Sequence, residues 1–183
     1  MKKISILMAA LLLAAFSYAQ ENLMTLSGGY VFTNLEETDV NANGWRINGL
    51  YEYNPQGGKM AHGLSFGYAS VTAESGTGLG NTTYDIGTIP IYYAPKFLFG
   101  SDQFKGFVKG AVGVHFSNIK REGALGSLKS DDFGFNIGGG VGAMYFFNEK
   151  LFTNFEYELL WQSNNYYRDG LQNTAALGIG MKF

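Results

Sequence analysis

Residues 171–183 read LQNTAALGIGMKF, and this stretch decides the fold class. Stepping back by twos from its last residue gives a series of apolar side chains, which are Phe183, Met181, Ile179, Leu177 and Ala175. The residues between them are small or polar. This alternation predicts a β-strand with one apolar and one non-apolar face. Because an open apolar edge invites aggregation, we expect this strand to pair with another strand of the same chain.

The start of the chain has the pattern of an export signal. Lys2 and Lys3 precede an apolar run at 4–16, and Ser17-Tyr18-Ala19 is a small-x-small cleavage site. This pattern predicts a secretory signal peptide at 1–19, because the apolar run is too short for a membrane helix, which is the alternative. Cleavage leaves a domain of 164 residues at 20–183. The chain contains no Cys, which excludes a lipoprotein and disulfides.

The composition narrows the class further. No segment after residue 19 has the eighteen or so consecutive apolar residues of a membrane helix. Gly is abundant at 26 residues, Pro is scarce at three, and aromatic residues make up 16% of the chain. The net charge is −2, with no basic cluster beyond Lys120-Arg121, so a nucleic-acid partner is disfavoured. An exported, aromatic-rich and Gly-rich chain with alternating segments is typical of a membrane-spanning β-barrel.

Eight alternating segments are separated by polar breaks. Their approximate bounds are 22–34, 44–53, 61–73, 83–98, 105–117, 131–147, 151–161 and 171–183. The breaks alternate between long and short: the predicted long loops are 35–43, 74–82, 118–130 and 162–170, and the short turns are 54–60, 99–104 and 148–150. The sequence therefore predicts an all-β fold, an eight-stranded antiparallel up-and-down transmembrane β-barrel, in which the first strand pairs with the last.

The two faces of each strand follow from the alternation. In segment 44–53 we expect Trp45 and Ile47 to point outward and Arg46 and Asn48 inward, and segments 131–147 and 151–161 alternate in the same way. Segment 83–98 changes phase at Pro90, which predicts a β-bulge there. Tyr and Trp residues near strand ends are predicted to form two aromatic girdles, with Tyr53, Tyr93 and Tyr145 on one side and Tyr30, Trp45, Tyr84 and Trp161 on the other.

Four inward charged residues are the first candidates for function. Counting from the strand ends places Lys109 near Glu156 and, at a higher level, Arg46 near Glu158. We predict a structural network of ion pairs that fills the barrel, and the alternative is a gate or proton path. The inward glycines, which are Gly113, Gly134, Gly138, Gly140 and Gly142, leave two possibilities open. Either Phe152, Leu160 and Arg46 fill that space, or a small water-filled cavity remains.

His115 and Ser117 share one face of a strand, as the His and Ser of a hydrolytic site would. The pair resembles the His-x-Ser pair of outer-membrane lipid A deacylases, but alternation turns both side chains toward the lumen, away from a lipid substrate. We therefore predict that the chain is not an enzyme. With two His and no Cys, the sequence predicts neither a metal site nor a cofactor.

Ile89-Pro90-Ile91 followed by Lys96-Phe97 is similar to a recurring fourth-strand pattern of the small porin-like β-barrel family. Together with the export signal and the terminal Phe, the chain resembles that family and the outer-membrane protein X family over nearly all of 20–183. The resemblance implies the outer membrane of a Gram-negative bacterium, a barrel without a peptidoglycan-binding module, and a monomer. It also implies outer-membrane lipids and lipopolysaccharide as partners. During biogenesis it implies periplasmic chaperones and the barrel-assembly machinery, with Ala175, Leu177, Ile179, Met181 and Phe183 as the assembly signal.

Three functional hypotheses follow. The first is a structural and surface-interaction role with a lumen filled by side chains. The second is a narrow porin-like channel for small solutes. The third, the weakest, is a lipid A-modifying hydrolase that uses His115 and Ser117. The predicted loop 162–170 carries Asn164, Asn165, Tyr166, Tyr167 and Arg168, a combination suited either to binding surfaces or sugars or simply to a solvated loop.

Overall fold

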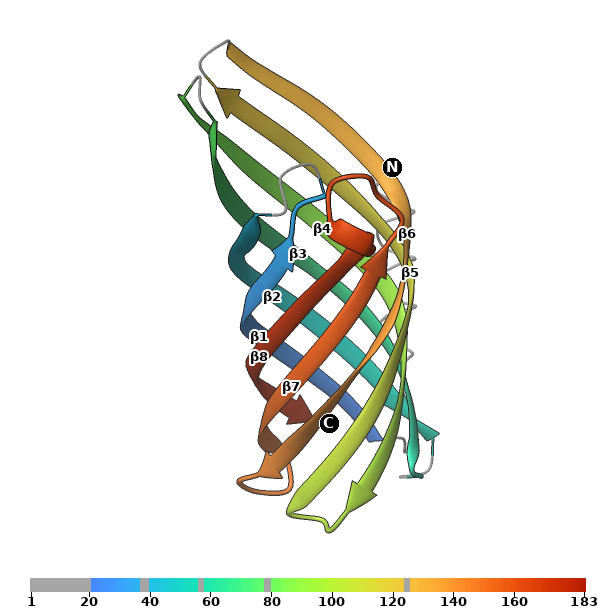
Figure 1. Cartoon of the computed structure of the whole chain (residues 1–183). Helices are drawn as coiled ribbons and strands as arrows, with labels where there is room; N and C mark the ends of the chain where they lie inside the picture. Colours follow the sequence, from blue (N-terminus) through green and yellow to red (C-terminus); the bar gives the residue numbers. More distant parts are fainter. Residues whose placement is uncertain (1–20, 37–39, 56–57, 78–79, 124–125) are drawn as a thin grey trace, which may run out of the picture.

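The computed structural model describes residues 21–36, 40–55, 58–77, 80–123 and 126–183. Its eight strands form one closed antiparallel barrel in which each strand pairs with its neighbours in sequence (Figure 1). The strands are β1 (Glu21–Asn34), β2 (Asn41–Asn54), β3 (Met60–Thr77), β4 (Gly80–Gly100), β5 (Phe104–Gly123), β6 (Gly126–Phe146), β7 (Leu151–Gln162) and β8 (Leu171–Lys182). A short 3-10 helix, η2 (Arg168–Gly170), precedes β8. The predicted fold class is confirmed, and the predicted signal peptide at 1–19 lies outside the described residues.

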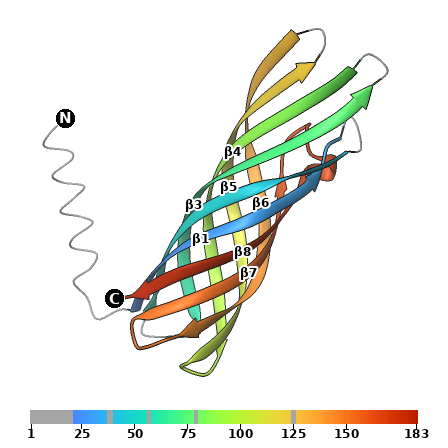
Figure 2. The same cartoon turned by 90° about the vertical axis from the view of Figure 1, so that its left-hand side faces the viewer.

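The barrel is closed by β1 and β8, as predicted. The two strands pair antiparallel, with Leu26 opposite Ile179. Beyond the end of β8, Phe183 and Asn22 exchange two backbone hydrogen bonds of 2.9 and 3.1 Å. The start of β1 and the end of β8 lie together at one end of the barrel, which we call the lower end; the end that carries η2 is the upper end (Figure 2). Closure leaves no open apolar edge at this seam.

The barrel wall is taller on one side. β3 and β4 remain paired as far as Thr77 and Gly80, and β5 and β6 as far as Gly123 and Gly126, so these strands rise above η2 (Figure 1). The prediction of loops at 74–82 and 118–130 is therefore wrong, because most of the described residues in these ranges belong to strands. Backbone pairing does not require apolar side chains, so the alternation fades where both faces of a strand contact water.

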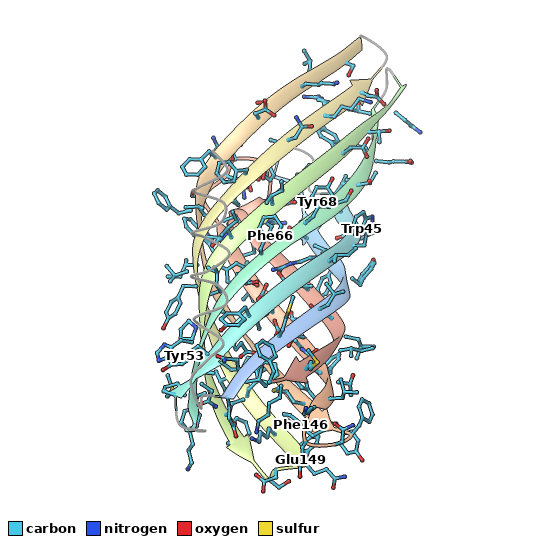
Figure 3. The ribbon with its side chains drawn as sticks, turned by 180° about the vertical axis from the view of Figure 1, so that it is seen from behind. Trp45, Tyr53, Phe66, Tyr68, Phe146 and Glu149 are labelled. Atoms are coloured by element: carbon cyan, nitrogen blue, oxygen red, sulfur yellow. The ribbon has the colours of Figure 1, made fainter. Side chains whose placement is uncertain are left out.

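The outer face carries a broad band of exposed apolar side chains. Phe135 on β6 is 66% exposed and Ile179 on β8 is 70% exposed. Figure 3 shows Trp45, Phe66 and Tyr68 on the upper part of the wall and Tyr53 near the lower end. Trp45 and Tyr68 lie in ring contact, with centroids 5.5 Å apart. An apolar surface of this extent requires a cover, and a lipid bilayer flanked by aromatic girdles provides one.

β4 departs from its predicted form. The pairs Ala69 with Thr88 and Phe66 with Ile91, on either side of Pro90, keep the same register with β3, and the register with β5 is also constant through Pro90. No residue is inserted, so the predicted bulge at Pro90 is wrong. The ring of Pro90 points into the barrel interior, as do the other even-numbered residues of the strand.

The apparent phase change in β4 has a different cause. Tyr84 and Ile86 are buried in an apolar cluster of the upper lumen, together with Val31, Val71 and Tyr167. Tyr84 is therefore not part of the outer aromatic girdle, which corrects that prediction. Apolar residues occupy both faces of the strand, because the upper lumen is itself apolar. Alternation in sequence does not reveal the inner face in such a segment.

Candidate functional site in the barrel interior

The four charged residues named from the sequence meet in the middle of the lumen. Alternation turns Arg46 of β2, Lys109 of β5, and Glu156 and Glu158 of β7 inward, and all but the partly exposed Glu156 are buried. The Arg46 Nη1 atom lies 2.5 Å from Glu158 Oε1. The Lys109 Nζ atom lies 2.5 Å from Glu158 Oε2 and also pairs with Glu156. Glu158 is therefore the centre of the network and pairs with both cations, while Glu156 supplies the second negative charge.

Neutral side chains complete the coordination of the network. The Tyr92 hydroxyl donates to Glu158 Oε2 at 2.7 Å and accepts from Arg46 Nη2 at 2.7 Å. The side-chain Oδ1 atom of Asn48 accepts from Arg46 Nη2 at 3.2 Å and from the Ser65 hydroxyl at 2.9 Å. Buried charges are tolerated when they are paired and hydrogen-bonded, and both conditions hold here except at the Arg46 Nε atom, which is buried without a hydrogen-bond partner.

A second ion pair lies below the network. Lys96 of β4 and Glu52 of β2 are buried, with Nζ and Oε1 2.7 Å apart. The Lys96 ammonium also lies 4.3 Å from the centroid of the Phe107 ring, a cation–π contact. This ion pair was not predicted from the sequence. Alternation could have predicted it. Lys96 and Tyr92 are both even-numbered residues of β4, and Glu52 and Arg46 are both even-numbered residues of β2, so all four side chains point inward.

Apolar layers separate the charges from both ends of the barrel. The lower cluster consists of Leu23, Ala61, Leu98, Phe107, Met144, Phe146 and Phe152. Above the charges lies the upper cluster, which contains Val31, Val71, Tyr84 and Tyr167. The cavity beside Arg46 and Glu158 has a volume of about 10 Å³, which is room for about one water molecule.

The inward glycines allow large side chains to fill the lumen. A Cβ atom on Gly138 would lie 3.0 Å from the Leu160 side chain, and one on Gly142 would overlap the Phe107 ring. Gly180 makes the same room for Phe152. The sequence left open whether side chains or a small water-filled cavity occupy this space. In this region the structure shows that side chains fill it.

His115 and Ser117 are not hydrogen-bonded to each other in the structure. Neither ring nitrogen of His115 has a hydrogen-bond partner, and its Nε2 lies 3.8 Å from Asp132 Oδ2. The Ser117 hydroxyl instead bonds to the Thr88 hydroxyl at 2.9 Å and accepts from the Tyr166 hydroxyl at 2.6 Å. A nucleophile requires a hydrogen bond to its base, so this arrangement gives no support to the hydrolase hypothesis.

The β7–β8 connection folds over the upper mouth of the lumen. Tyr167 is buried in the upper cluster, and it forms an isolated β-bridge with Leu35. Burial raises the pKa of the Tyr166 phenol to about 12, and burial also raises the pKa of the Tyr167 phenol. These two rings point into the barrel, so they do not form the exposed polar-aromatic tip that the sequence suggested.

The remaining predicted positions are placed as follows. Leu177, Ile179, Met181 and Phe183 are exposed on the outer face, and Ala175 beside them is partly exposed. In the ranges that the structure describes, no group of three His, Asp or Glu side chains could hold a metal ion. Among those residues there is also no helix that is long and apolar enough to cross a membrane.

A closed eight-stranded barrel with an apolar outer band and a polar, salt-bridged interior defines a class: the membrane-spanning β-barrels. The sequence profile of the family described as "Outer membrane protein beta-barrel domain" matches residues 4–183. The chain belongs to this family. No curated protein sequence matches the chain.

Solved structures of small outer-membrane barrels share the fold. A major outer membrane protein from Thermus thermophilus superposes with a TM-score of 0.65 at 10% identity, covering 89% of this chain and 99% of the other. Neisserial surface protein A gives 0.63 at 12% identity, covering 88% and 97%. Ail, the attachment invasion locus protein of Yersinia pestis, gives 0.53 at 18% identity, covering 88% and 99%. At these identities the similarity shows the fold alone.

Proposed function

We propose that this chain is an integral outer-membrane barrel with a structural and surface-interaction role, and that its lumen does not conduct. The observation that carries the proposal is the filled interior. The paired charges around Glu158 lie between two apolar clusters, and the cavity beside them has room for about one water molecule. An eight-stranded barrel is just wide enough for side chains to fill it.

The surface role is supported by the unequal height of the wall. Bacterial barrels have short periplasmic turns and longer extracellular loops, so we expect the lower end, which carries both termini, to face the periplasm and the upper end to face outside. The upper parts of β3–β6 extend beyond η2 (Figure 2). Polar side chains cover this extension, among them Thr72, Asp85, Asn118 and Asp131. Exposed segments on a rigid scaffold are where binding residues concentrate.

Recording from planar bilayers tests the closed lumen. The folded full-length chain is inserted at increasing protein-to-lipid ratios, and a general porin is measured in the same bilayers as a positive control. The expected result is no stable conductance step for this chain while the porin gives regular steps. Reproducible steps from protein that gel electrophoresis shows to be folded would overturn the proposal.

A narrow channel is the second candidate. The observation that favours it is the position of the small cavity, which lies against the carboxylates of Glu156 and Glu158 and the guanidinium of Arg46. If ions passed, they would contact these groups, so Glu156→Gln would change the conductance. A conductance that depends on Glu156 would replace the closed-lumen proposal with this one.

Biogenesis is the last part of the proposal. We expect the outward apolar residues of β8 and the adjoining Phe183 to be read by the barrel-assembly machinery, as the resemblance implies. Deleting Phe183 removes its two backbone hydrogen bonds to Asn22, a small loss for a barrel closed along its whole length. Insertion in cells should therefore fall more than the stability of the refolded protein. Wild-type amounts of folded protein in the outer membrane after the deletion would exclude this role.

A further inference from the structure

A hollow of about 610 Å³ lies on the outer face of the barrel where β8, β1 and β2 reach the upper end. It does not connect to the charge network, and nothing in the proposed function uses it. The residues that line it are Tyr30, Phe32, Thr33, Asn34, Asn41, Ala42, Asn43, Arg168, Asp169, Leu171 and Asn173. Aromatic rings and four asparagine amides therefore share one concave surface, which is the usual shape of a ligand site.

The strand register arranges these residues around one ring. Phe32 on β1 lies opposite Asn43 on β2 and also opposite Asn173 on β8, so an amide flanks the ring on each side. At the next outward position toward the upper end, Asn34 lies opposite Asn41. These residues therefore form a row of aromatic and amide side chains across β8, β1 and β2. Backbone pairing fixes the relative positions of the three strands.

Neighbouring aromatic residues hold this row in place. The Tyr30 and Phe32 rings stack with their centroids 6.2 Å apart and 26° between their planes. The Tyr157 hydroxyl donates to Asn173 Oδ1 at 2.7 Å, which leaves the Asn173 amide nitrogen as the donor for a ligand. The side chains of the hollow are thus partly preorganised, which reduces the entropic cost of binding.

The chemistry of the hollow fits a sugar. Sugar hydroxyls both donate and accept hydrogen bonds, as primary amides do, and the C–H face of a sugar ring packs against an aromatic face. Among the lining residues, Arg168 and Asp169 carry one charge of each sign, so the hollow has no net charge that would select an ion. Asp169 has φ 54° and is the one non-glycine residue of the described chain with positive φ, so a less common backbone conformation shapes this wall.

The position of the hollow identifies the source of the sugar. Tyr30 lies opposite Trp45, a residue of the upper aromatic girdle, and Phe32 is the next outward residue above Tyr30. The aromatic floor is therefore continuous with the apolar band, at the level where lipid head groups begin. The geometry points to a binding site for the sugar head group of an outer-leaflet glycolipid, with Phe32 beneath a sugar ring and Asn43 and Asn173 at its edges. The site requires the upper end to face outward, but it does not depend on whether the lumen conducts.

The test measures glycolipid binding to the folded full-length chain. The barrel is placed in phosphatidylcholine nanodiscs that contain graded amounts of a rough-type lipopolysaccharide, and retained glycolipid is counted by native mass spectrometry. The variant Asn43→Ala with Asn173→Ala should bind roughly tenfold or more weakly, because two amide hydrogen bonds are lost. Phe32→Leu, which keeps an apolar side chain but removes the ring face, should also weaken binding.

The matched control is Gln103→Ala, which removes an exposed amide from the β4–β5 turn at the lower end, away from the hollow. It should bind like the wild type, and heat-modifiable gel mobility checks that every variant is folded. Equal binding by the wild type and the double variant would overturn the site.

Two further binding measurements distinguish a glycolipid from a soluble glycan and from a lipid without a sugar. The delipidated core oligosaccharide in solution should not compete at concentrations where the glycolipid saturates the site. Competition with equal affinity would show that the occupant is a soluble glycan and would overturn the assignment to a lipid. Phosphatidylglycerol, which has acyl chains but no sugar, should bind equally to the wild type and the double variant. Weakening of its binding by the double variant would show that the site does not recognise sugars.

Discussion

The guanidinium of Arg46 on β2 lies 2.5 Å from the carboxylate of Glu158 on β7, although these two strands are not hydrogen-bonded neighbours. The contact crosses the lumen rather than following the sheet. Glu158 also holds Lys109 of β5, so one carboxylate connects three strands of the barrel wall.

Glu158→Gln should destabilise the barrel far more than Glu156→Gln. The first change leaves Arg46 and Lys109 with a single carboxylate between them, and removing one partner of a buried ion pair costs about 3–5 kcal/mol. Glu156 is less buried, and Lys109 would keep Glu158 after its loss, so a cost of about 1 kcal/mol is expected there. Urea unfolding from liposomes measures both. Equal costs would mean that the network is not centred on Glu158.

Val141→Arg should cost about 2–4 kcal/mol, because it places a charge in the lipid-facing band of β6. Leu128→Arg is the matched control on the upper extension of the same strand. Val141 is 53% exposed and Leu128 70%, so both positions accept a long side chain without steric conflict. Leu128→Arg should change the free energy of unfolding in liposomes by less than about 0.5 kcal/mol. A similar loss at both positions would place the upper part of β6 inside the membrane.

Gly142→Ala should destabilise the barrel by about 1–3 kcal/mol, because the added methyl group overlaps the Phe107 ring and the Phe155 carbonyl oxygen. Gly49→Ala is the control, since the nearest atom to a Cβ atom there is the Phe66 carbonyl oxygen at 3.7 Å. This control should cost little. If thermal unfolding in detergent gave the same midpoint for the wild type and Gly142→Ala, the filled packing of the lower lumen would be wrong.

Tyr166 should make the stability depend on pH in alkaline solution. Burial raises the pKa of its phenol from the ordinary 10 to about 12, so the unfolded state loses this proton first. The stabilisation of the folded state by the protonated phenol is fully present below pH 10. Up to about 2 kcal/mol of it is lost as the pH rises toward 12.

Tyr166→Phe removes this titration together with the hydrogen bond to Ser117. At pH 9 the variant should be less stable than the wild type by about 1 kcal/mol. Between pH 10 and 12 this difference should vanish and then reverse, because the wild type loses up to about 2 kcal/mol that the variant does not lose. Unfolding midpoints of the two proteins at matched pH values provide the measurement. A constant difference across this range would contradict the buried position of Tyr166.

The sequence predicted those parts of the fold in which one face of a strand meets lipid and the other a polar lumen. In β2, for example, Trp45 and Ile47 alternate with Arg46 and Asn48, and the structure places them on the expected faces. The prediction failed where that contrast disappears. Tyr84 and Ile86 are apolar residues of the inner face, and the upper part of β6, residues 126–131, is exposed on both faces.

The candidate site was predictable only in part. Counting residues from the strand ends predicted that Lys109 lies near Glu156 and that Arg46 lies near Glu158. It did not reveal that Glu158 is shared between both cations, because that depends on the reach of each side chain across the lumen. The inward folding of Tyr166 and Tyr167 was not predictable either, since a loop of Asn and Tyr residues has the same composition whether it is exposed or inserted.

The contact between Arg46 and Glu158 has a consequence for the order of folding. Along the sheet, β2 and β7 are separated by the four strands between them, whereas across the seam only β1 and β8 lie between them. In a sheet that has not yet closed, Arg46 and Glu158 would be held far apart, and both charges would be without this partner. The ion pair therefore forms only after β1 pairs with β8. It stabilises the closed barrel and does not stabilise any separate hairpin.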